Sequence, residues 1–438
     1  MKKILFSIII LVVSISISSQ AQFSINGQLV QRFEYRHGYN KVIAQGLDPA
    51  IFIAQRLRLE GGYSFDKVQF YVALQDVRTW GSAPQTKIID GYFSLYEGYA
   101  QINIDSFWSV KVGRQELNYD NARFLGNLDW ALQGRSHDFA LVKFEKNNAK
   151  LHFGGGYNQD GQSLSGNFFA TQNQYKTAQF ARYEQKVKDF TLSALVWNNG
   201  RQYALYDSLG NIKEKEVRFS QTFGLSNLSY KKKNSTLSAF FYYQTGRDVK
   251  DNKMNAFDAN LQFSQNIPLN DSIKSSIQIT AGAEVLSGTP SNNKEAVNKS
   301  FLPMYGTNHA HNGYMDMYYV GGRHENSVGL NDIFLRFKYN INKKSFISLN
   351  AHVFLAYAAV YDKSGNEMKK NLGQELDFSA GYVFNKSLSL QGGYSHYFAT
   401  NTMELLQGIT TPKNVQNWAY LMLIVRPNNT KKFIGLLY

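Results

Sequence analysis

The sequence predicts an all-β protein, a transmembrane antiparallel β-barrel of about 18 strands with short periplasmic turns and long extracellular loops. Three observations predict this fold. Apolar and polar residues alternate with a period of two in many segments. Short and long connections follow each other in turn between these segments. The composition is rich in aromatic residues, yet it lacks the apolar runs of a helical membrane protein.

The composition excludes a membrane protein built of helices. Mean hydropathy is −0.36, while aromatic residues make up 15% of the chain, with 28 Tyr, 31 Phe and 34 Gly against 7 Pro. After residue 21, no apolar stretch reaches the roughly 18 residues that indicate a spanning helix. Cysteine is absent, so no disulfide braces the fold. Tyr, Phe and Gly in these amounts favour sheets with two different faces.

The first residues predict a cleaved secretory signal peptide. Lys2 and Lys3 precede an apolar run from Ile4 to Ile17, and small and polar residues follow as far as Ala21. We therefore expect residues 1–21 to be the signal and residues 22–438 to form a single barrel domain, because no Pro-rich or Ser-rich linker divides them. The expected location is the bacterial outer membrane.

Alternation is clearest at both ends of the chain. In the segment 23–37, Phe23, Ile25 and Leu29 fall on one face, and polar residues fall mostly on the other. Successive side chains of a strand point to opposite faces, so one face is expected to meet lipid and the other the lumen. The predicted strands are 23–37, 50–64, 67–79, 91–104, 107–117, 135–146, 149–157, 174–187, 190–198, 216–231, 235–245, 254–265, 275–287, 327–341, 345–359, 371–384, 388–398 and 417–426.

The connections support the barrel independently. Short joints, such as 65–66, 105–106 and 147–148, take turns with long loops. The predicted long loops are 38–49, 80–90, 118–134, 158–173, 199–215, 288–326, 360–370 and 399–416. This order separates periplasmic turns from extracellular loops. The exception is 266–274, a longer turn with Pro268 on the periplasmic side, and a tail of uncertain placement, 427–438, follows the last strand. A soluble sandwich or propeller would not explain this order of loops. A propeller would also show a blade repeat of about 40 residues, and the sequence has none.

Charge predicts a cationic interior. The formal net charge is +14, of which Lys2 and Lys3 contribute two. A charged side chain on the lipid face costs roughly 2–4 kcal/mol at mid-bilayer, so the basic residues of the strands should face inward or lie at a rim. These are Arg32, Arg36, Arg56, Arg58, Lys111, Arg336 and Lys338. The excess favours passage of anions. For any single arginine, an ion pair that braces the wall is the stronger interpretation.

Between Gln55 and Glu145 the sequence resembles the alginate export family of outer-membrane proteins. The similar stretches are QRLRL (55–59), QDVRTWG (75–81), LYEGYAQI (95–102), KVGRQELNYDNARFLGNLDW (111–130) and GRSHDF (134–139). The resemblance covers about a third of the chain in motif. It implies a monomeric channel with an arginine-rich constriction that exports an anionic polyuronate.

The resemblance also implies particular roles for residues in this stretch. The candidates for the cationic pathway are Arg56, Arg58, Arg78, Arg114, Arg123 and Arg135. The carboxylates that the resemblance implies as their partners are Asp76, Glu116, Asp129 and Asp138, and Glu97, which faces inward by alternation, is also expected to pair with a guanidinium. Arg78 and Arg114 share parity with lipid-facing positions, so they are expected either above the bilayer or after a β-bulge. For Arg114 and Arg123, a structural knot of Arg–Asp pairs is as good an interpretation as conduction.

Other function classes find less support. A row of Ser348, Asn350 and His352 on one inward face is better read as a polar wall than as a nucleophile site. His309, His311 and His324 in the longest loop are too few for a metal site, so no metal, cofactor or enzymatic activity is expected. The competing prediction is an adhesin or a secretion-system scaffold with a plugged lumen. The expected partners are outer-membrane lipid and lipopolysaccharide, an anionic polysaccharide or small anionic solutes, and periplasmic export proteins, with no nucleic acid.

Overall fold

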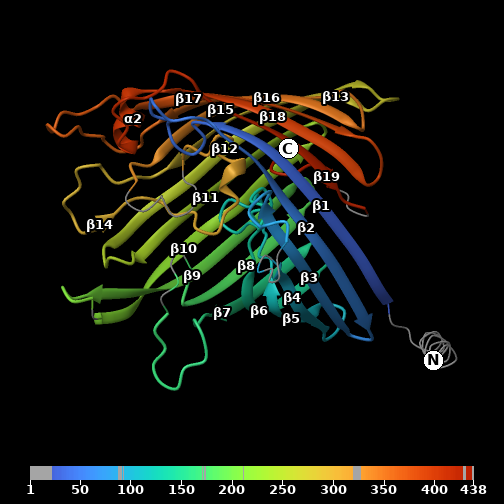
Figure 1. Cartoon of the computed structure of the whole chain (residues 1–438). Coiled ribbons are helices and arrows are strands. Elements are labelled where there is room, and N and C mark those ends of the chain that lie inside the picture. Colours follow the sequence, from blue (N-terminus) through green and yellow to red (C-terminus); the bar gives the residue numbers. More distant parts are fainter. Residues whose placement is uncertain are drawn as a thin grey trace.

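Neighbouring strands pair antiparallel along the chain and close into a barrel (Figure 1). The computed structural model describes residues 22–86, 91, 93–169, 171, 174–210, 212–318, 327–427 and 431–436. The predicted signal peptide, 1–21, lies outside them. Within the described residues, one sheet contains nineteen strands. One of these, β14 (Val297–Asn298), is a two-residue strand within a loop, and the other eighteen form the wall.

The wall strands are β1 (Gln22–His37), β2 (Ala50–Phe65), β3 (Val68–Thr79), β4 (Phe93–Asn103), β5 (Trp108–Gln115), β6 (His137–Lys146), β7 (Ala149–Tyr157), β8 (Thr177–Val187), β9 (Phe190–Tyr206), β10 (Ile212–Lys232), β11 (Ser235–Arg247), β12 (Lys253–Asn270), β13 (Ser275–Leu286), β15 (Leu330–Asn340), β16 (Ser345–Leu355), β17 (Asn371–Val383), β18 (Leu388–Ala399) and β19 (Gln416–Val425). The barrel closes where β1 pairs with β19, from Leu29 opposite Val425 to His37 opposite Asn417. The predicted fold class is therefore confirmed. No helix among the described residues has the length and hydropathy needed to span a membrane.

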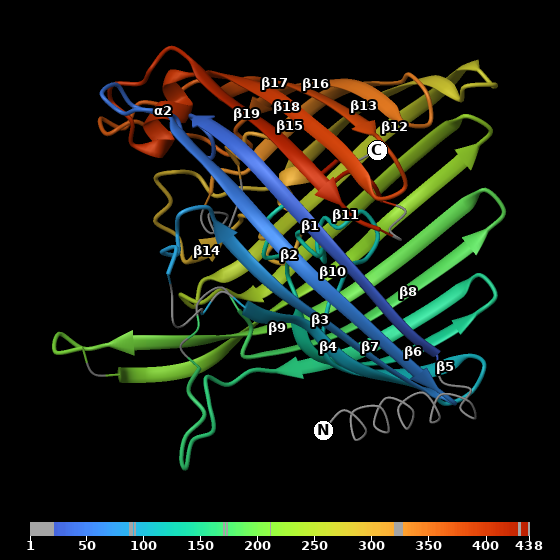
Figure 2. The same cartoon turned by 45° about the vertical axis from the view of Figure 1, so that its right-hand side comes forward.

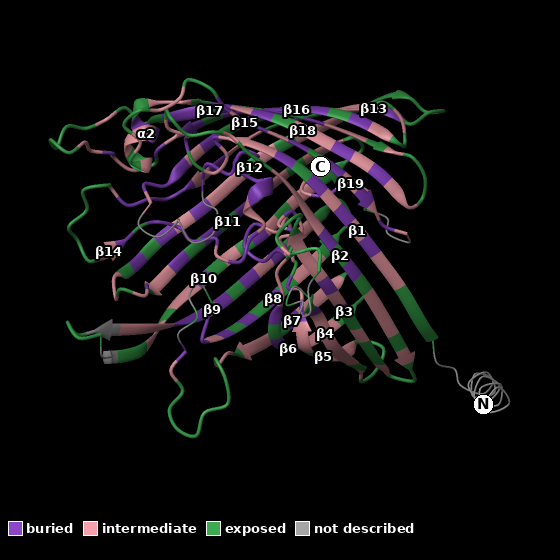
Figure 3. Cartoon of the chain, viewed as in Figure 1, coloured by how far each residue is buried: buried purple, intermediate pink, exposed green. Residues whose placement is uncertain are grey.

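Side chains alternate between the two faces of the wall as expected (Figure 3). On β2, Arg56 is fully buried and Arg58 is 6% exposed, while Leu57 and Leu59 between and beside them are 53% and 56% exposed. An apolar outer face and a polar inner face are the arrangement of a barrel in a bilayer. Each wall strand also pairs with two neighbours, which satisfies its backbone N–H and C=O groups as hydrocarbon requires.

Long and short connections lie at opposite ends of the barrel. The first strand begins and the last ends at the end with short turns, called here the turn side, and the other end is called the loop side. A short helix, α2 (Asn401–Gln407), lies in the loop between β18 and β19; Thr400 accepts a hydrogen bond from the backbone N–H of Met403 at its start. Figure 2 shows α2 at the loop side, at the upper left.

Two predicted boundaries were wrong. The segment 199–215 was expected to be a loop, but β9 and β10 continue pairing through it, for example Gln202 with Val217, and only 207–211 connect them. Polar residues there hide the alternation, because this hairpin projects past the rest of the wall (Figure 2). The expected long turn at 266–274 is also mostly strand. β12 passes through Pro268 with a register shift beside it, which suits a residue without an N–H.

Candidate functional site

Two loops from the loop side fold into the barrel and meet there. The short inner loop (residues 116–136) connects β5 and β6, and the long inner loop (residues 287–329, described as 287–318 and 327–329) connects β13 and β15. Both contribute to the buried apolar cluster inside the barrel, with Leu125 and Met315 almost inaccessible. The long loop contains a one-turn 3-10 helix, η2 (Asn308–Ala310).

Backbone hydrogen bonds join the two inner loops directly. The N–H of Gly126 donates to the carbonyl of Tyr305 at 2.8 Å, and the N–H of Thr307 donates to the carbonyl of Ala122 at 2.8 Å. The Thr307 hydroxyl also accepts from the N–H of Leu128 at 3.0 Å. A Cβ at Gly126 would approach the Thr307 hydroxyl to 2.3 Å, so this contact needs glycine. The loops therefore form one plug inside the barrel.

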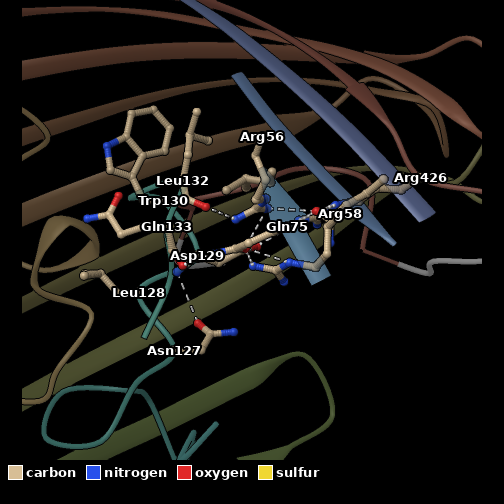
Figure 4. A network of polar contacts seen from close by, with 12 residues as sticks. Arg56, Arg58, Gln75, Asn127, Leu128, Asp129, Trp130, Leu132, Gln133 and Arg426 are labelled. Carbon is tan, nitrogen blue, oxygen red and sulfur yellow. Dashed lines mark hydrogen bonds and ion pairs between the residues drawn. The ribbon is translucent and has the colours of Figure 1, made fainter. Parts of the chain in front are cut away.

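Arginines of β2 and of the end of β19 anchor the short inner loop to the wall (Figure 4). Arg56 pairs with Asp129 at 2.8 Å and donates to the carbonyl of Leu132 at 3.0 Å. Arg426, just after β19, reaches the same Asp129 carboxylate at 3.0 Å. Both guanidiniums also donate to the side-chain oxygen of Gln28. Burial by itself would raise the pKa of Asp129, but the two guanidiniums overcome it and hold that pKa well below its usual range.

Two further arginines support the same loop. Arg32 donates to the carbonyl of Trp130 at 2.6 Å, lies 4.3 Å above its ring centroid, and pairs with Glu34 at 2.8 Å. Arg58 lies 3.5 Å above the ring centroid of Tyr96 and acts on the loop through Gln75, which accepts from Arg58 and donates to the carbonyl of Gln133 at 2.8 Å. Cation–π stacking and short charge-assisted bonds of this kind fix the loop backbone in place. These guanidiniums are thus structural braces in this conformation.

Arg123 is the centre of a buried ion cluster that ties the short inner loop to the opposite wall. Its Nε lies 3.0 Å from Asp258 of β12 and 2.6 Å from Glu284 of β13. Its two terminal nitrogens donate to Asn308 and Asn312 of the long inner loop. The Arg123 side chain is fully buried. Of the two interpretations that the sequence allowed for Arg123, this geometry corresponds to the structural knot rather than to a group in the conducting path.

Three of the predicted carboxylates lie against arginines. Asp76 contacts Arg78 through both oxygens, Asp129 contacts Arg56, and Asp138 contacts Arg114 at 3.0 Å. The Arg114–Asp138 pair is 38% and 62% exposed, so it lies at the surface of the wall near the loop side. A register shift between Ala73 and Leu74 in the β3–β4 pairing precedes Arg78, and a bulge before this residue was one of the two alternatives that the sequence left open.

Glu97 and Glu116 are different. Their hydrogen-bond partners among the described residues are neutral: Glu116 accepts from the hydroxyl of Tyr96 at 2.5 Å and from Asn127 at 3.1 Å, and Glu97 accepts from the N–H of Glu116 at 2.9 Å. The structure therefore does not bring them into the arginine pairs that were expected. Arg58 instead lies over the ring of Tyr96 and donates to Gln75.

The remaining predicted cations are distributed along the lumen. Lys111 lies 3.5 Å from the ring centroid of Tyr99, and Arg336 lies 4.1 Å from that of Phe334. Lys338 is 5.0 Å from the ring centroid of Phe346. Arg36 pairs with Glu34 at 2.8 Å and lies above Tyr39. Alternation in the strands was sufficient to place these side chains inward.

A cavity of about 770 Å³ opens above the plug on the loop side, and it is called here the outer cavity. The charged groups lining it are Arg32, Arg36, Arg78, Arg135, Glu34 and Asp316. Arg135 differs from the other three arginines, because its partners are the carbonyls of Gly126 and Gly306, at 3.3 and 2.9 Å. Burial lowers the pKa of Arg135 to about 10, which leaves the guanidinium charged at neutral pH. The four guanidiniums outnumber the two lining carboxylates even when Asp76, the partner of Arg78, is added to them.

The tail closes part of the turn side. Residues 431–436 turn back into the barrel, where Ile434 is 2% exposed and exchanges two hydrogen bonds of 2.9 Å with the side chain of Gln391. Phe433 packs edge to face on Phe346, and Gly435 lies against Trp130 of the short inner loop. Residues 428–430, 437 and 438 lie outside the described part of the chain. The tail therefore touches both the wall and the plug.

Sequence reasoning missed several partners in these networks. Asp258 and Glu284 were not singled out, although each is a carboxylate at an inward position of a wall strand, and that parity was a usable signal. Arg426 and Gln28 also escaped notice. The stacking of His309 on Trp130, with centroids 4.1 Å apart, joins the two inner loops and has no signal in the sequence.

The residues considered for catalysis and metal binding are arranged otherwise. His352 bonds to Asp332 at 2.9 Å, whereas the Ser348 hydroxyl bonds to that of Ser379 at 2.6 Å. His309 bonds to Asp316 at 3.0 Å, and His324 lies outside the described residues. Among the described residues, no group of three or more potential ligands could hold a metal ion.

Comparison with known proteins identifies the fold. No family model matches the chain, and no curated protein matches it, so the resemblance to the alginate export family remains a prediction.

Solved structures do match the fold of the chain. OpdK of Pseudomonas aeruginosa with vanillate has a TM-score of 0.57 at 12% identity, covering 92% of this chain and 98% of that one. OccK9 (OpdG) of the same organism has a TM-score of 0.58 at 12% identity, with the same coverage of both chains. OccK3 (OpdO), also from that organism, has a TM-score of 0.55 at 14% identity, covering 92% and 95%. The chain thus has the fold of outer-membrane barrels of this kind.

Proposed function

We propose that the protein is an outer-membrane channel that passes small anionic solutes. The observation that carries the proposal is the outer cavity, where four guanidiniums face two carboxylates at the loop side of a barrel with an apolar outer surface. Net positive potential in a narrow lumen raises the local concentration of anions and lowers that of cations. The apolar surface supports location in a membrane, and closed barrels of this size are known there.

Arg135 and Arg36 are the residues that we expect to contact a passing anion. Arg135 borders the outer cavity and also a second cavity of about 250 Å³ beside Tyr305 and Tyr175. Among the described residues its guanidinium bonds only to carbonyls, so no carboxylate of that part of the chain neutralises its charge through a hydrogen bond. Arg36 is one-third exposed and shares Glu34 with Arg32. Guanidiniums bind carboxylates in a bidentate fashion.

The comparisons support a carboxylate as the solute class. OpdK, which shares the fold, was solved with vanillate, whose charged group is a carboxylate. An alginate-like polysaccharide remains the finer candidate for the substrate, since the segments resembling that family, 111–130 and 134–139, build the short inner loop. A polymer chain needs a continuous passage, so its export requires the two inner loops to separate. A plugged scaffold barrel is the remaining alternative.

Single-channel recording in planar bilayers tests the proposal. We expect conductance with a reversal potential, in a KCl gradient, that shows preference for chloride over potassium. The double variant R36Q/R135Q should reduce that preference, because it removes two of the four guanidiniums of the outer cavity. R247Q is the matched control, since Arg247 is 57% exposed at the end of β11 and lies against Asp251.

The outcomes separate the alternatives. A barrel that inserts but does not conduct would overturn the channel and favour the plugged scaffold. Cation preference, or identical reversal potentials in R36Q/R135Q and the wild type, would overturn the anion assignment. Block by vanillate or benzoate but not by alginate oligomers would exclude the polysaccharide, and block by the oligomers alone would favour it.

A further inference from the structure

A third cavity lies on the turn side of the plug, and its lining differs from that of the outer cavity. It measures about 270 Å³ and is called here the turn-side cavity. Its floor is formed by Asn121 and His311 of the inner loops, and its wall by the inward faces of β11, β12, β13 and β15. The volume is just below the range of roughly 300–1,000 Å³ typical of sites for drug-sized ligands. It therefore suits a compound the size of a monosaccharide.

The wall of the turn-side cavity is lined mainly by amides and hydroxyls. Two pairs bond to each other: Gln262 donates to Ser238 at 3.1 Å, and Ser264 bonds to Thr280 at 2.7 Å. Three more side chains, Thr236, Asn260 and Gln278, line the cavity without a side-chain hydrogen bond to any described residue. Each such amide offers donors and an acceptor, which is the combination that neighbouring sugar hydroxyls need.

His311 supplies an independent sign of an absent partner. The residue is 5% exposed, yet its Nε2 atom is buried with no hydrogen-bond partner among the described residues. Burial and the nearby Arg123 and Arg336 hold the pKa of His311 well below its usual range, so the ring is neutral. A neutral imidazole can accept from or donate to a hydroxyl. The Nε2 atom has less than 1 Å² of accessible surface, so a hydroxyl in the cavity reaches it only when the ring turns.

The charged groups that line the turn-side cavity are Arg336, Lys338 and Glu284. Arg336 stacks on Phe334 and donates to the carbonyl of His311 at 3.3 Å, so it is held at the wall. The carboxylate of Glu284 is already paired with Arg123 at 2.6 Å, so Arg336 and Lys338 leave the cavity with a positive charge. The rings of Phe240 and Phe334 supply apolar surface for the C–H face of a sugar ring.

We propose that the turn-side cavity binds a hydroxyl-rich ring of monosaccharide size, through Asn260 and Gln278. The proposal rests on the channel function for its place on the solute path, but binding is measurable without conduction. It implies that the transported solute carries hydroxyls as well as a negative charge: the outer cavity selects the charge, and the turn-side cavity selects the hydroxyls.

Saturation-transfer NMR on the detergent-solubilised full chain tests binding directly, with methyl glucoside as a neutral probe and benzoate as an acid without sugar hydroxyls. The glucoside should bind the wild type, and N260A/Q278A should weaken it by roughly tenfold, the loss expected for two hydrogen bonds. Q101A is the matched control, because Gln101 is a half-buried amide of β4 that does not line this cavity. T236V gives a smaller change of shape should the double variant fail to fold.

Each result bears on the proposal. Absence of glucoside binding to the wild type overturns it and leaves the channel function untouched. Equal binding by N260A/Q278A and wild type, or equal weakening in Q101A, also overturns it, because the site is then elsewhere. Benzoate binding that N260A/Q278A weakens equally would show that hydroxyls are not selected. A barrel that binds the glucoside but never conducts would sustain the site and refute the channel.

Discussion

Removing the guanidinium of Arg123 should release the plug and destabilise the barrel. R123M keeps a long apolar side chain but leaves Asp258 and Glu284 buried without their counter-ion. At separations of 3.0 and 2.6 Å, and with an effective dielectric constant of about 20, each attraction is about 5–6 kcal/mol. Protonation of one carboxyl recovers part of this, so the expected loss in unfolding free energy is about 3–5 kcal/mol.

Urea unfolding followed by tryptophan fluorescence measures that loss, and single-channel recording measures the release of the plug. R123M should unfold at lower urea and conduct more than the wild type, because four bonds from Arg123 to the wall and the long inner loop are gone. The triple variant R123M/D258N/E284Q should regain most of the stability, since no buried charge is left without a partner. A change below about 0.5 kcal/mol in R123M, the range of ordinary surface substitutions, together with unchanged conductance, would refute this account of the knot.

Two other predictions follow from the plug and the tail. I434D should displace the tail from Gln391, because an unpaired charge is unfavourable at a site that is 2% exposed. The turn side should then be more open and single-channel conductance higher. Unchanged conductance would contradict a closing role for the tail. The pKa of Asp129 is depressed in the folded chain, so its contribution to stability is complete above the ordinary aspartate range and is lost as pH falls toward the depressed value. Acidification below about pH 4 should therefore loosen the short inner loop and raise single-channel conductance. The variant D129N should conduct already at neutral pH, and its conductance should change less on acidification. A wild type whose conductance does not respond to acid would contradict the role of Asp129 as an anchor.

Local pattern was sufficient for the wall of the barrel. In a strand, the side-chain direction is fixed by position alone, so Leu57 and Arg56 could be assigned to opposite faces without any knowledge of the fold. The same rule placed Lys111, Arg336 and Lys338 inward. It failed at 199–215, where the strands leave the apolar belt and no lipid face imposes alternation.

The local sequence pattern could not show which arginines are paired with carboxylates. Whether a guanidinium is free or neutralised depends on which carboxylate reaches it, and those partners are far away in sequence: Asp258 lies 135 residues from Arg123, and Arg426 lies 297 residues from Asp129. The resemblance of 55–139 to an export family marked Arg56, Arg123 and Arg135 together. Only the structure shows two of them bonded to carboxylates and the third to backbone carbonyls.

The sequence by itself determined an alternating, closed wall with a basic interior, because period-two patterning and net charge are properties of the chain that no tertiary contact alters. The tertiary structure decided how the interior is filled. Loop closure brings 116–136, 287–318 and 431–436 into one lumen, and their mutual contacts depend on loop paths rather than on periodicity. It therefore decided that most arginines brace a plug and that the unneutralised charge gathers in the outer cavity.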